Sequence, residues 1–262
     1  MSLFESLILG IIQGLTEFLP VSSSGHLEVF KVIFGSDYQP KESLLITITL
    51  HSATALSTLF YFRKDIYYIF KELLRFEKSK SLDFTLKIIL SMIPAVIVGL
   101  FFEDFIANLF NGNLLLVGFM LIITAFLLFQ ADRISTNNKP LNYRSVLLIG
   151  VIQAIAILPG ISRSGATIAM AVVLGIDREK AARFSFLMVI PLIFGSMVNR
   201  LLKIDSVTQS LDLFSLLVGF ITAFITGIFA CKWMIAIVKK SQLKYFSFYC
   251  IVVGVIAIVY AF

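Results

Sequence analysis

The chain has 262 residues, of which 58% are hydrophobic and only 15% are charged, and its mean hydropathy is +0.95. A soluble domain carries about 25% charged residues, so this composition excludes a fully solvated surface and favours a membrane protein. The net charge of +6 does not indicate a nucleic-acid partner, because no basic cluster is interleaved with aromatic residues. The two cysteines stand in apolar stretches, without the spacing of a metal site or a disulfide framework.

The first broken region, residues 6–34, is apolar but interrupted in its middle by LPVSSSGH, which we call the first tip (residues 19–26). Each half has only about 10 to 14 residues, too few to cross the bilayer as a helix. A break at membrane depth is tolerated where it lines a cavity or protein interior. We therefore predict a re-entrant helix pair, with a kinked spanning helix as the alternative. The first basic residue is Lys31, so we expect no cleavable signal peptide here.

A second broken region, residues 145–176, is interrupted by LPGISRSGAT, the second tip (residues 158–167). Three apolar stretches follow each broken region, and each is close to the roughly 20 residues that span a bilayer. The six stretches are 44–62, 84–102, 113–130, 184–199, 213–231 and 245–262. The sequence thus predicts an all-α, polytopic membrane protein with six transmembrane helices and two re-entrant helix pairs.

The two broken regions resemble each other after a shift of 140 residues. The shift places these residues in register: Gly10 on Gly150, Ile12 on Ile152, Gln13 on Gln153, Ser22 on Ser162, Ser24 on Ser164 and Gly25 on Gly165. Three spans follow each break, and an odd number inverts the second half relative to the first. We predict one membrane domain, 1–262, made of two inverted repeats, 1–130 and 145–262, with a site at their interface near the midplane.

Basic residues are concentrated in four of the connecting segments. These segments are 63–83, 131–144, 177–183 and 239–244, whereas the other connections contain few Lys or Arg. Because basic loops face the cytoplasm, both termini are expected outside. The first re-entrant pair then enters from outside and the second from the cytoplasm, so that their tips can meet.

The first broken region carries acid–base chemistry. Gln13 and Glu17 are four residues apart and share one helix face. A carboxylate at membrane depth is functional by default, and Glu17 is suited to binding a divalent cation together with pyrophosphate oxygens. With His26 it offers an acid or base beside the candidate nucleophiles Ser22 and Ser23. The alternatives are a purely structural carboxylate and a satisfied buried histidine.

Both tips are also candidate anion sites. Serines followed by glycine at a helix N-terminus cap free N–H groups and form an anion cradle. The cradle residues are Ser22, Ser23, Ser24 and Gly25 in the first tip, and Ser162, Ser164 and Gly165 in the second. Arg163 adds a guanidinium suited to bidentate phosphate contacts, with a structural counter-ion to Glu17 as its alternative. For the serines, a role in helix capping alone is the alternative. His51 ranks lower as a candidate site residue, because it can be either a cavity-lining or a structural histidine.

Two segments, QGLTEFLPVSSSGHL (13–27) and LPGISRSGATIAM (158–170), strongly resemble the undecaprenyl pyrophosphate phosphatase family of bacterial membrane enzymes. The first matches that family's [E/Q]-x-x-x-E signature and the second its P-G-x-S-R-S-x-x-T signature. The resemblance implies Glu17, Ser23, His26 and Arg163 as catalytic residues, with Ser22, Ser162, Ser164 and Thr167 as phosphate contacts. Gln13 is the amide variant of the first signature position, which puts a two-carboxylate metal site in doubt.

The resemblance further implies hydrolysis of undecaprenyl pyrophosphate to undecaprenyl phosphate and inorganic phosphate, which recycles the lipid carrier of peptidoglycan. It implies Mg²⁺ or Ca²⁺ dependence, bacitracin resistance, and a bacterial inner-membrane location with the site open to the outer face. Oligomeric state is left open. A transporter or lipid flippase on the same inverted repeat is the alternative function, and a non-catalytic scaffold would not explain charged tips at membrane depth.

Overall fold

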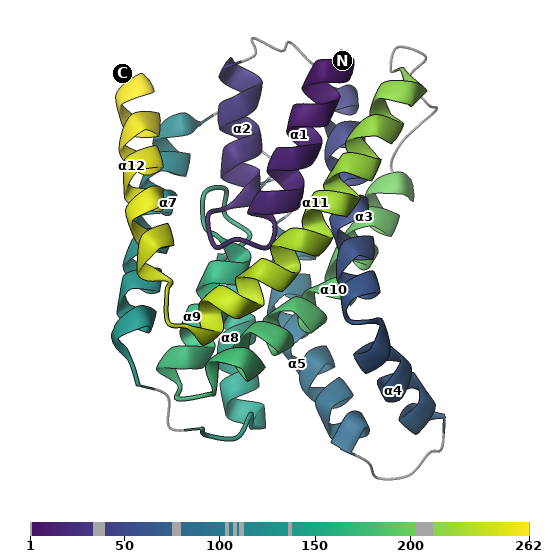
Figure 1. Cartoon of the computed structure of the whole chain (residues 1–262), viewed down its shortest axis with the longest axis vertical. Helices are drawn as coiled ribbons and strands as arrows, with labels where there is room; N and C mark the ends of the chain where they lie inside the picture. Colours follow the sequence, from purple (N-terminus) through teal and green to yellow (C-terminus); the bar gives the residue numbers. More distant parts are fainter. Residues whose placement is uncertain are drawn as a thin grey trace.

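The computed structural model describes residues 2–33, 40–74, 80–102, 105–106, 109, 113–135, 138–202 and 212–261. Apart from one isolated β-bridge between Lys139 and Ile176, the regular elements in these ranges are helices (Figure 1). They are α1 (Leu3–Thr16), α2 (Ser23–Ile33), α3 (Pro40–Tyr61), α4 (Arg63–Leu73), α5 (Lys80–Phe101), α7 (Leu114–Arg133), α8 (Tyr143–Ile155), α9 (Arg163–Val173), α10 (Arg178–Leu202), α11 (Leu213–Lys239) and α12 (Lys244–Tyr260). The all-α prediction is confirmed.

Four of these helices, α5, α7, α10 and α11, are long and apolar enough to cross a membrane. A bent pair formed by α3 and α4 would add a fifth span, and α12 is a shorter apolar helix of 17 residues. Large hydrophobic side chains such as Phe126, Phe229 and Val259 are exposed on these helices, as expected where lipid is the solvent. The chain is therefore a multi-pass membrane protein.

Helix α4 was not predicted, because the basic segment 63–83 was interpreted as a loop. It bends away from α3 by 72°, next to Phe62, whose backbone departs from helical geometry. Ile66 packs against the core, whereas Tyr67 and Phe70 are exposed. Hydropathy alone does not reveal a short amphipathic helix with this many charges. Helix α11 also runs on to Lys239, beyond the predicted limit of 231.

Both broken regions are interrupted as predicted, and neither is a continuous kinked helix. In the first, α1 ends at Thr16 and α2 begins at Ser23; in the second, α8 ends at Ile155 and α9 begins at Arg163. Each break includes a left-handed residue, Ser22 with φ 70° and Gly160 with φ 94°, which a helix cannot accommodate. In Figure 1, α1 and α2 occupy the upper half of the molecule and α8 and α9 the lower half.

The helices of the two halves pack against each other in corresponding pairs. Helix α1 packs on α11 and α8 packs on α5, while α7 and α12 form the most extensive contact. Glycines permit these close approaches: a β-carbon on Gly10 would lie 2.6 Å from the Gly219 carbonyl oxygen, and one on Gly150 would lie 2.4 Å from that of Ser91. Gly10 and Gly150, which the 140-residue shift matches, therefore have the same packing role in each half.

Candidate active site

The two tips meet in the interior of the molecule. The Arg163 guanidinium at the start of α9 forms an ion pair with the Glu17 carboxylate, just after the end of α1 and 146 residues away in sequence. The side chains are 18% and 6% exposed, respectively. Two charges this deeply buried are stable only when paired and hydrogen-bonded. The contact brings together the two signature segments that the sequence analysis singled out.

Glu17 is the centre of the site, and both of its carboxylate oxygens are engaged. One oxygen, Oε1, pairs with Arg163. The other, Oε2, accepts hydrogen bonds from Gln13 Nε2 at 3.0 Å and from the Ser23 hydroxyl at 2.8 Å, and lies 3.7 Å from His51 Nε2. Carboxylate, hydroxyl, amide, imidazole and guanidinium groups therefore converge on one buried point.

Two buried polar atoms of this cluster have no hydrogen-bond partner in the structure: Arg163 Nη1 and Gln13 Oε1. Buried donors and acceptors are nearly always satisfied, so each is available to a ligand. Arg163 can therefore offer Nη1 to a phosphate oxygen while Nη2 keeps its ion pair with Glu17. Gln13 can offer a carbonyl oxygen while its amide nitrogen stays on the same carboxylate.

The serines at the two tips have matching roles as helix caps. Ser22 Oγ accepts a hydrogen bond from the Gly25 backbone N–H at 3.3 Å, and Ser162 Oγ accepts one from the Gly165 N–H at 3.1 Å. Both serines are almost completely buried. The expected capping is confirmed in both tips, whereas phosphate contacts by these four residues stay a prediction.

The remaining predicted phosphate contacts have partners within the protein. The Ser24 hydroxyl lies 3.3 Å from Ser22 Oγ, and the Ser164 hydroxyl lies at the same distance from Ser162 Oγ. Thr167 is buried one turn into α9, with its hydroxyl 2.6 Å from that of Ser185. Its contact with a phosphate also stays a prediction.

Sequence reasoning missed a residue that holds the second tip in place. The buried hydroxyl of Thr124 on α7 accepts from the Ser162 N–H at 3.0 Å and donates to the Gly160 carbonyl at 3.3 Å. It satisfies two backbone groups that the helix break leaves free. A single threonine in an apolar span carries no signal that distinguishes it from a packing residue.

The two histidines have different surroundings, and His26 is placed differently from the sequence expectation. His26 was expected beside Ser23 as its acid or base, but the Ser23 hydroxyl donates to Glu17 instead. The ring nitrogens of His26 contact the Ser22 carbonyl at 2.8 Å and the Tyr249 hydroxyl at 2.7 Å. His51, ranked lower from the sequence, is the histidine that faces Glu17. His51 Nδ1 also contacts the carbonyl of Thr47, four residues earlier, at 2.9 Å. This local contact does not indicate that the ring faces Glu17.

The residues around Glu17 fit a divalent cation in part. Gln13 and Glu17 offer oxygen donors, which Mg²⁺ and Ca²⁺ prefer, and the Gln13 oxygen has no partner. Within the described part of the chain, no three His, Cys, Asp or Glu side chains are grouped to hold a metal ion. A cation at this point would therefore need further ligands from substrate phosphate or water.

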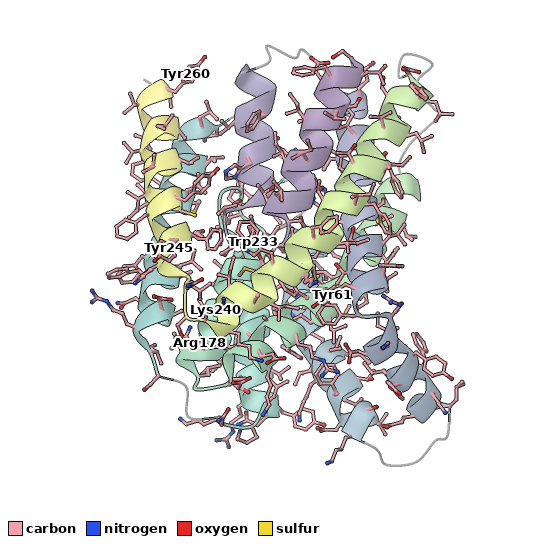
Figure 2. All side chains as sticks on the ribbon, viewed as in Figure 1. Tyr61, Arg178, Trp233, Lys240, Tyr245 and Tyr260 are labelled. Carbon is pink, nitrogen blue, oxygen red and sulfur yellow. The ribbon has the colours of Figure 1, made fainter. Side chains whose placement is uncertain are left out.

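A pocket of about 450 Å³ lies elsewhere, at the C-terminal end of α7, and includes none of the predicted site residues. Arg178 lines it and donates to three carbonyls, those of Ala131, Asp132 and Ile134. Arg178 and Lys240 lie in the lower half of the molecule and Tyr260 at its upper end (Figure 2). The pocket thus belongs to the end of the molecule that carries the basic connections, not to the meeting point of the tips.

Comparison with known proteins identifies the family of this chain. The family profile described as bacitracin resistance protein BacA matches residues 6–256. The chain belongs to the BacA family. An undecaprenyl-diphosphatase of Christiangramia forsetii is 58% identical over all of this chain and 99% of its own length. Those of Bacteroides fragilis and Methanococcus vannielii are 47% and 39% identical, each over 98% or more of both chains. The BacA match includes both tips and confirms the family resemblance.

Proposed function

We propose that this protein hydrolyses undecaprenyl diphosphate to undecaprenyl phosphate and inorganic phosphate. The main supporting observation is the buried contact of Glu17 with Ser23 and Arg163. It joins a base, a nucleophile and an anion-binding group, in that order. The names of the BacA relatives support the same reaction. The activity would recycle the lipid carrier for peptidoglycan and other envelope polymers and confer bacitracin resistance. Those names give no support to a transporter.

The diphosphate is bound by the second tip and the starts of α2 and α9. Arg163 Nη1, which has no protein partner, donates to a phosphate oxygen. The N-termini of the two helices add backbone dipoles and N–H groups that favour an anion. Ser24, Ser164 and Thr167 extend this binding surface. Electrostatic stabilisation of the charge that develops on the transferred phosphoryl group is the largest contribution expected.

Ser23 is the nucleophile in this proposal. Its Oγ forms a bond to the terminal phosphorus as the bond from that phosphorus to the bridging oxygen breaks, which releases undecaprenyl phosphate. The Ser23 proton passes to Glu17, the acceptor to which this hydroxyl already donates. Water then attacks the phosphoserine, and the bond from phosphorus to Ser23 Oγ breaks, which releases inorganic phosphate. The proton held by Glu17 returns to Ser23 Oγ and restores the serine. His26 or His51 relays the proton taken from that water.

Glu17 and Gln13 Oε1 would hold a divalent cation, with phosphate oxygens as further ligands. Such a cation would neutralise charge on the phosphates and polarise the bond to the bridging oxygen. Gln13 keeps its amide nitrogen on Glu17 in this arrangement, so the carboxylate stays oriented. Arg163 shares the neutralisation of Glu17 and of the bound phosphate.

A rival route has no covalent step, and a histidine activates water directly. The two routes differ at Ser23, because only the covalent route places phosphate on it. Rapid quench with substrate labelled in its terminal phosphate should trap labelled protein in wild type and none in Ser23→Ala. If wild type shows no labelled protein under any quench time, the covalent route is rejected.

The membrane arrangement that suits this chemistry is six spans and two re-entrant helix pairs in one inverted-repeat domain, residues 1–130 and 145–262. It is supported by the corresponding pairs α1–α11 and α8–α5, and by the position of both termini at the end of the molecule opposite the basic connections (Figure 1). With basic residues facing the cytoplasm of a bacterial inner membrane, the first tip is reached from the outer face.

The proposed function is tested by phosphate release from undecaprenyl diphosphate by the purified protein in detergent, with divalent cation and with chelator. We expect release that depends on the cation. Folded wild-type protein that releases no phosphate with either Mg²⁺ or Ca²⁺ would reject the hydrolase proposal.

A further inference from the structure

The His26 ring is held from both sides, although it lies outside the Glu17 cluster. Nδ1 lies 2.8 Å from the Ser22 carbonyl oxygen, and Nε2 lies 2.7 Å from the Tyr249 hydroxyl on α12. The two rings are nearly parallel, with planes 9° apart and centroids separated by 5.5 Å. His26 itself is only 4% exposed. The imidazole therefore has one orientation, fixed by a contact between sequence positions 223 residues apart.

These two contacts assign the hydrogens. A carbonyl oxygen can only accept, so His26 Nδ1 must carry the hydrogen that it shares with Ser22. In the neutral ring Nε2 is then the acceptor, and the Tyr249 hydroxyl is its donor. If Nε2 takes up a proton, the Tyr249 oxygen can accept from it in turn. The contact therefore persists in both protonation states of the imidazole.

The contact with His26 gives the Tyr249 hydroxyl a hydrogen-bond partner on a largely apolar helix face. The Tyr249 side chain is 44% exposed on α12, a helix whose outer face carries hydrophobic residues such as Val252 and Ile256. Phenylalanine would suit a lipid-facing surface equally well, because a hydroxyl without a partner in an apolar environment costs free energy. The next residue, Cys250, reaches the same tip through its thiol, 3.6 Å from the Pro20 carbonyl. Helix α12 thus touches the first tip through two consecutive side chains.

We propose that Tyr249 is a positioning residue of the active site, which fixes the orientation of the His26 ring so that Nδ1–H stays on the Ser22 carbonyl and Nε2 stays the basic nitrogen. This inference rests on the proposed function and takes His26, rather than His51, as the histidine that relays the proton. Tyr249 does not touch the substrate; it acts through His26. The contact joins the last helix of the second half to the first tip, so it also couples the two halves at the site.

The kinetic test is Tyr249→Phe, which removes the hydroxyl and keeps the ring. We expect kcat for phosphate release to fall about tenfold, the lower end of what losing an imidazole's orienting partner costs in metal sites. KM and the thermal midpoint should stay at wild-type values. Tyr245→Phe is the matched control, because Tyr245 lies one turn earlier on α12 and is 62% exposed; it should keep the wild-type rate. A Tyr249→Phe enzyme with wild-type kcat would overturn the proposal.

A spectroscopic test separates this inference from the proposed function. The chain has only two histidines, so ¹⁵N-histidine spectra can be assigned by comparison with His51→Gln. Wild type should show the His26 signals of a single tautomer, and Tyr249→Phe should shift them toward a mixture. Identical His26 signals in the two proteins would overturn the inference even if phosphate release is confirmed. Absence of phosphate release from wild type would instead reject the proposed function.

Discussion

The two broken regions have nearly the same backbone design but different chemistry. Both are capped by a serine that accepts from a glycine N–H three residues later. At the positions that matter chemically they diverge: the shift of 140 residues places Glu17 on Ile157, Ser23 on Arg163 and His26 on Ala166. In the proposed mechanism, the first region carries the base and the nucleophile, and the second carries the guanidinium of Arg163 that pairs with Glu17.

The ion pair at the site draws on both broken regions. A buried carboxylate requires a partner, and here the partner, Arg163, comes from the other broken region. Gln153 is the counterpart of Gln13 in the second region, where Ile157 stands in place of the carboxylate. Gln153 is fully buried, like Gln13, yet both of its amide atoms have no hydrogen-bond partner. The two regions share the serine caps that support the helix ends, and they differ in the side chains that those helix ends present.

The largest effect is expected from Ser23→Ala, because the second region has arginine at this position and cannot supply a replacement hydroxyl. Phosphate release should fall by about 10³-fold or more, as for the loss of a nucleophile. The matched control is Ser196→Ala, which removes an exposed hydroxyl bonded to its own helix and should keep the wild-type rate. A loss smaller than about tenfold for Ser23→Ala would contradict the assignment.

An intermediate effect should separate the two glutamines. Gln13→Leu removes the hydrogen bond to Glu17, so we expect phosphate release to fall by about tenfold or more, since a hydrogen bond to a charged group contributes about 1.5–3 kcal/mol. Gln153→Leu removes two unpartnered buried groups, each costing about 1–3 kcal/mol, and should raise the thermal midpoint with activity near wild type.

Together, the activities of the two glutamine variants test the division of chemistry between the halves. Equal losses of activity would mean that the second broken region also contributes an amide to the reaction. That result would contradict the division of chemistry between the halves.

The smallest effect is expected from the caps. Ser22→Ala and Ser162→Ala should each lower the free energy of unfolding by about 1 kcal/mol, the usual cost of losing a serine cap. Thermal unfolding in the same detergent measures both. Equal losses of unfolding free energy would support the equivalence of the two tips, and a loss in only one of the two variants would contradict it.

Much of this fold could be predicted from the sequence. The six apolar stretches and the two breaks follow from length, hydropathy and the placement of Pro, Gly and Ser, and each has a corresponding helix or helix pair. Helix α4 could not be predicted, because its charges conceal an amphipathic pattern only 11 residues long. The convergence of Glu17 and Arg163 was foreseen as a meeting of the tips, since unpaired buried charges are costly.

The finer geometry of the site depends on tertiary packing, which the sequence does not display. Nothing in the local sequence indicates that His51 faces Glu17 or that Tyr249 contacts His26, because the partners come from different segments of the chain. Thr124 likewise acts across helices, on the second tip. The motifs identified which chemical groups take part, and the packing of α3, α7 and α12 determined which of them touch.

The central claim is that Glu17 and Arg163 act as one unit shared by the two halves, and a double-mutant cycle of phosphate release tests it most directly. Glu17→Gln and Arg163→Gln would be measured singly and together, with thermal unfolding of each protein in the same detergent as a check on folding. The account predicts that the loss of activity in the double variant is smaller than the product of the two single losses, because both changes destroy the same ion pair. Losses that multiply fully in the double variant would show no coupling between the two residues and would contradict the account.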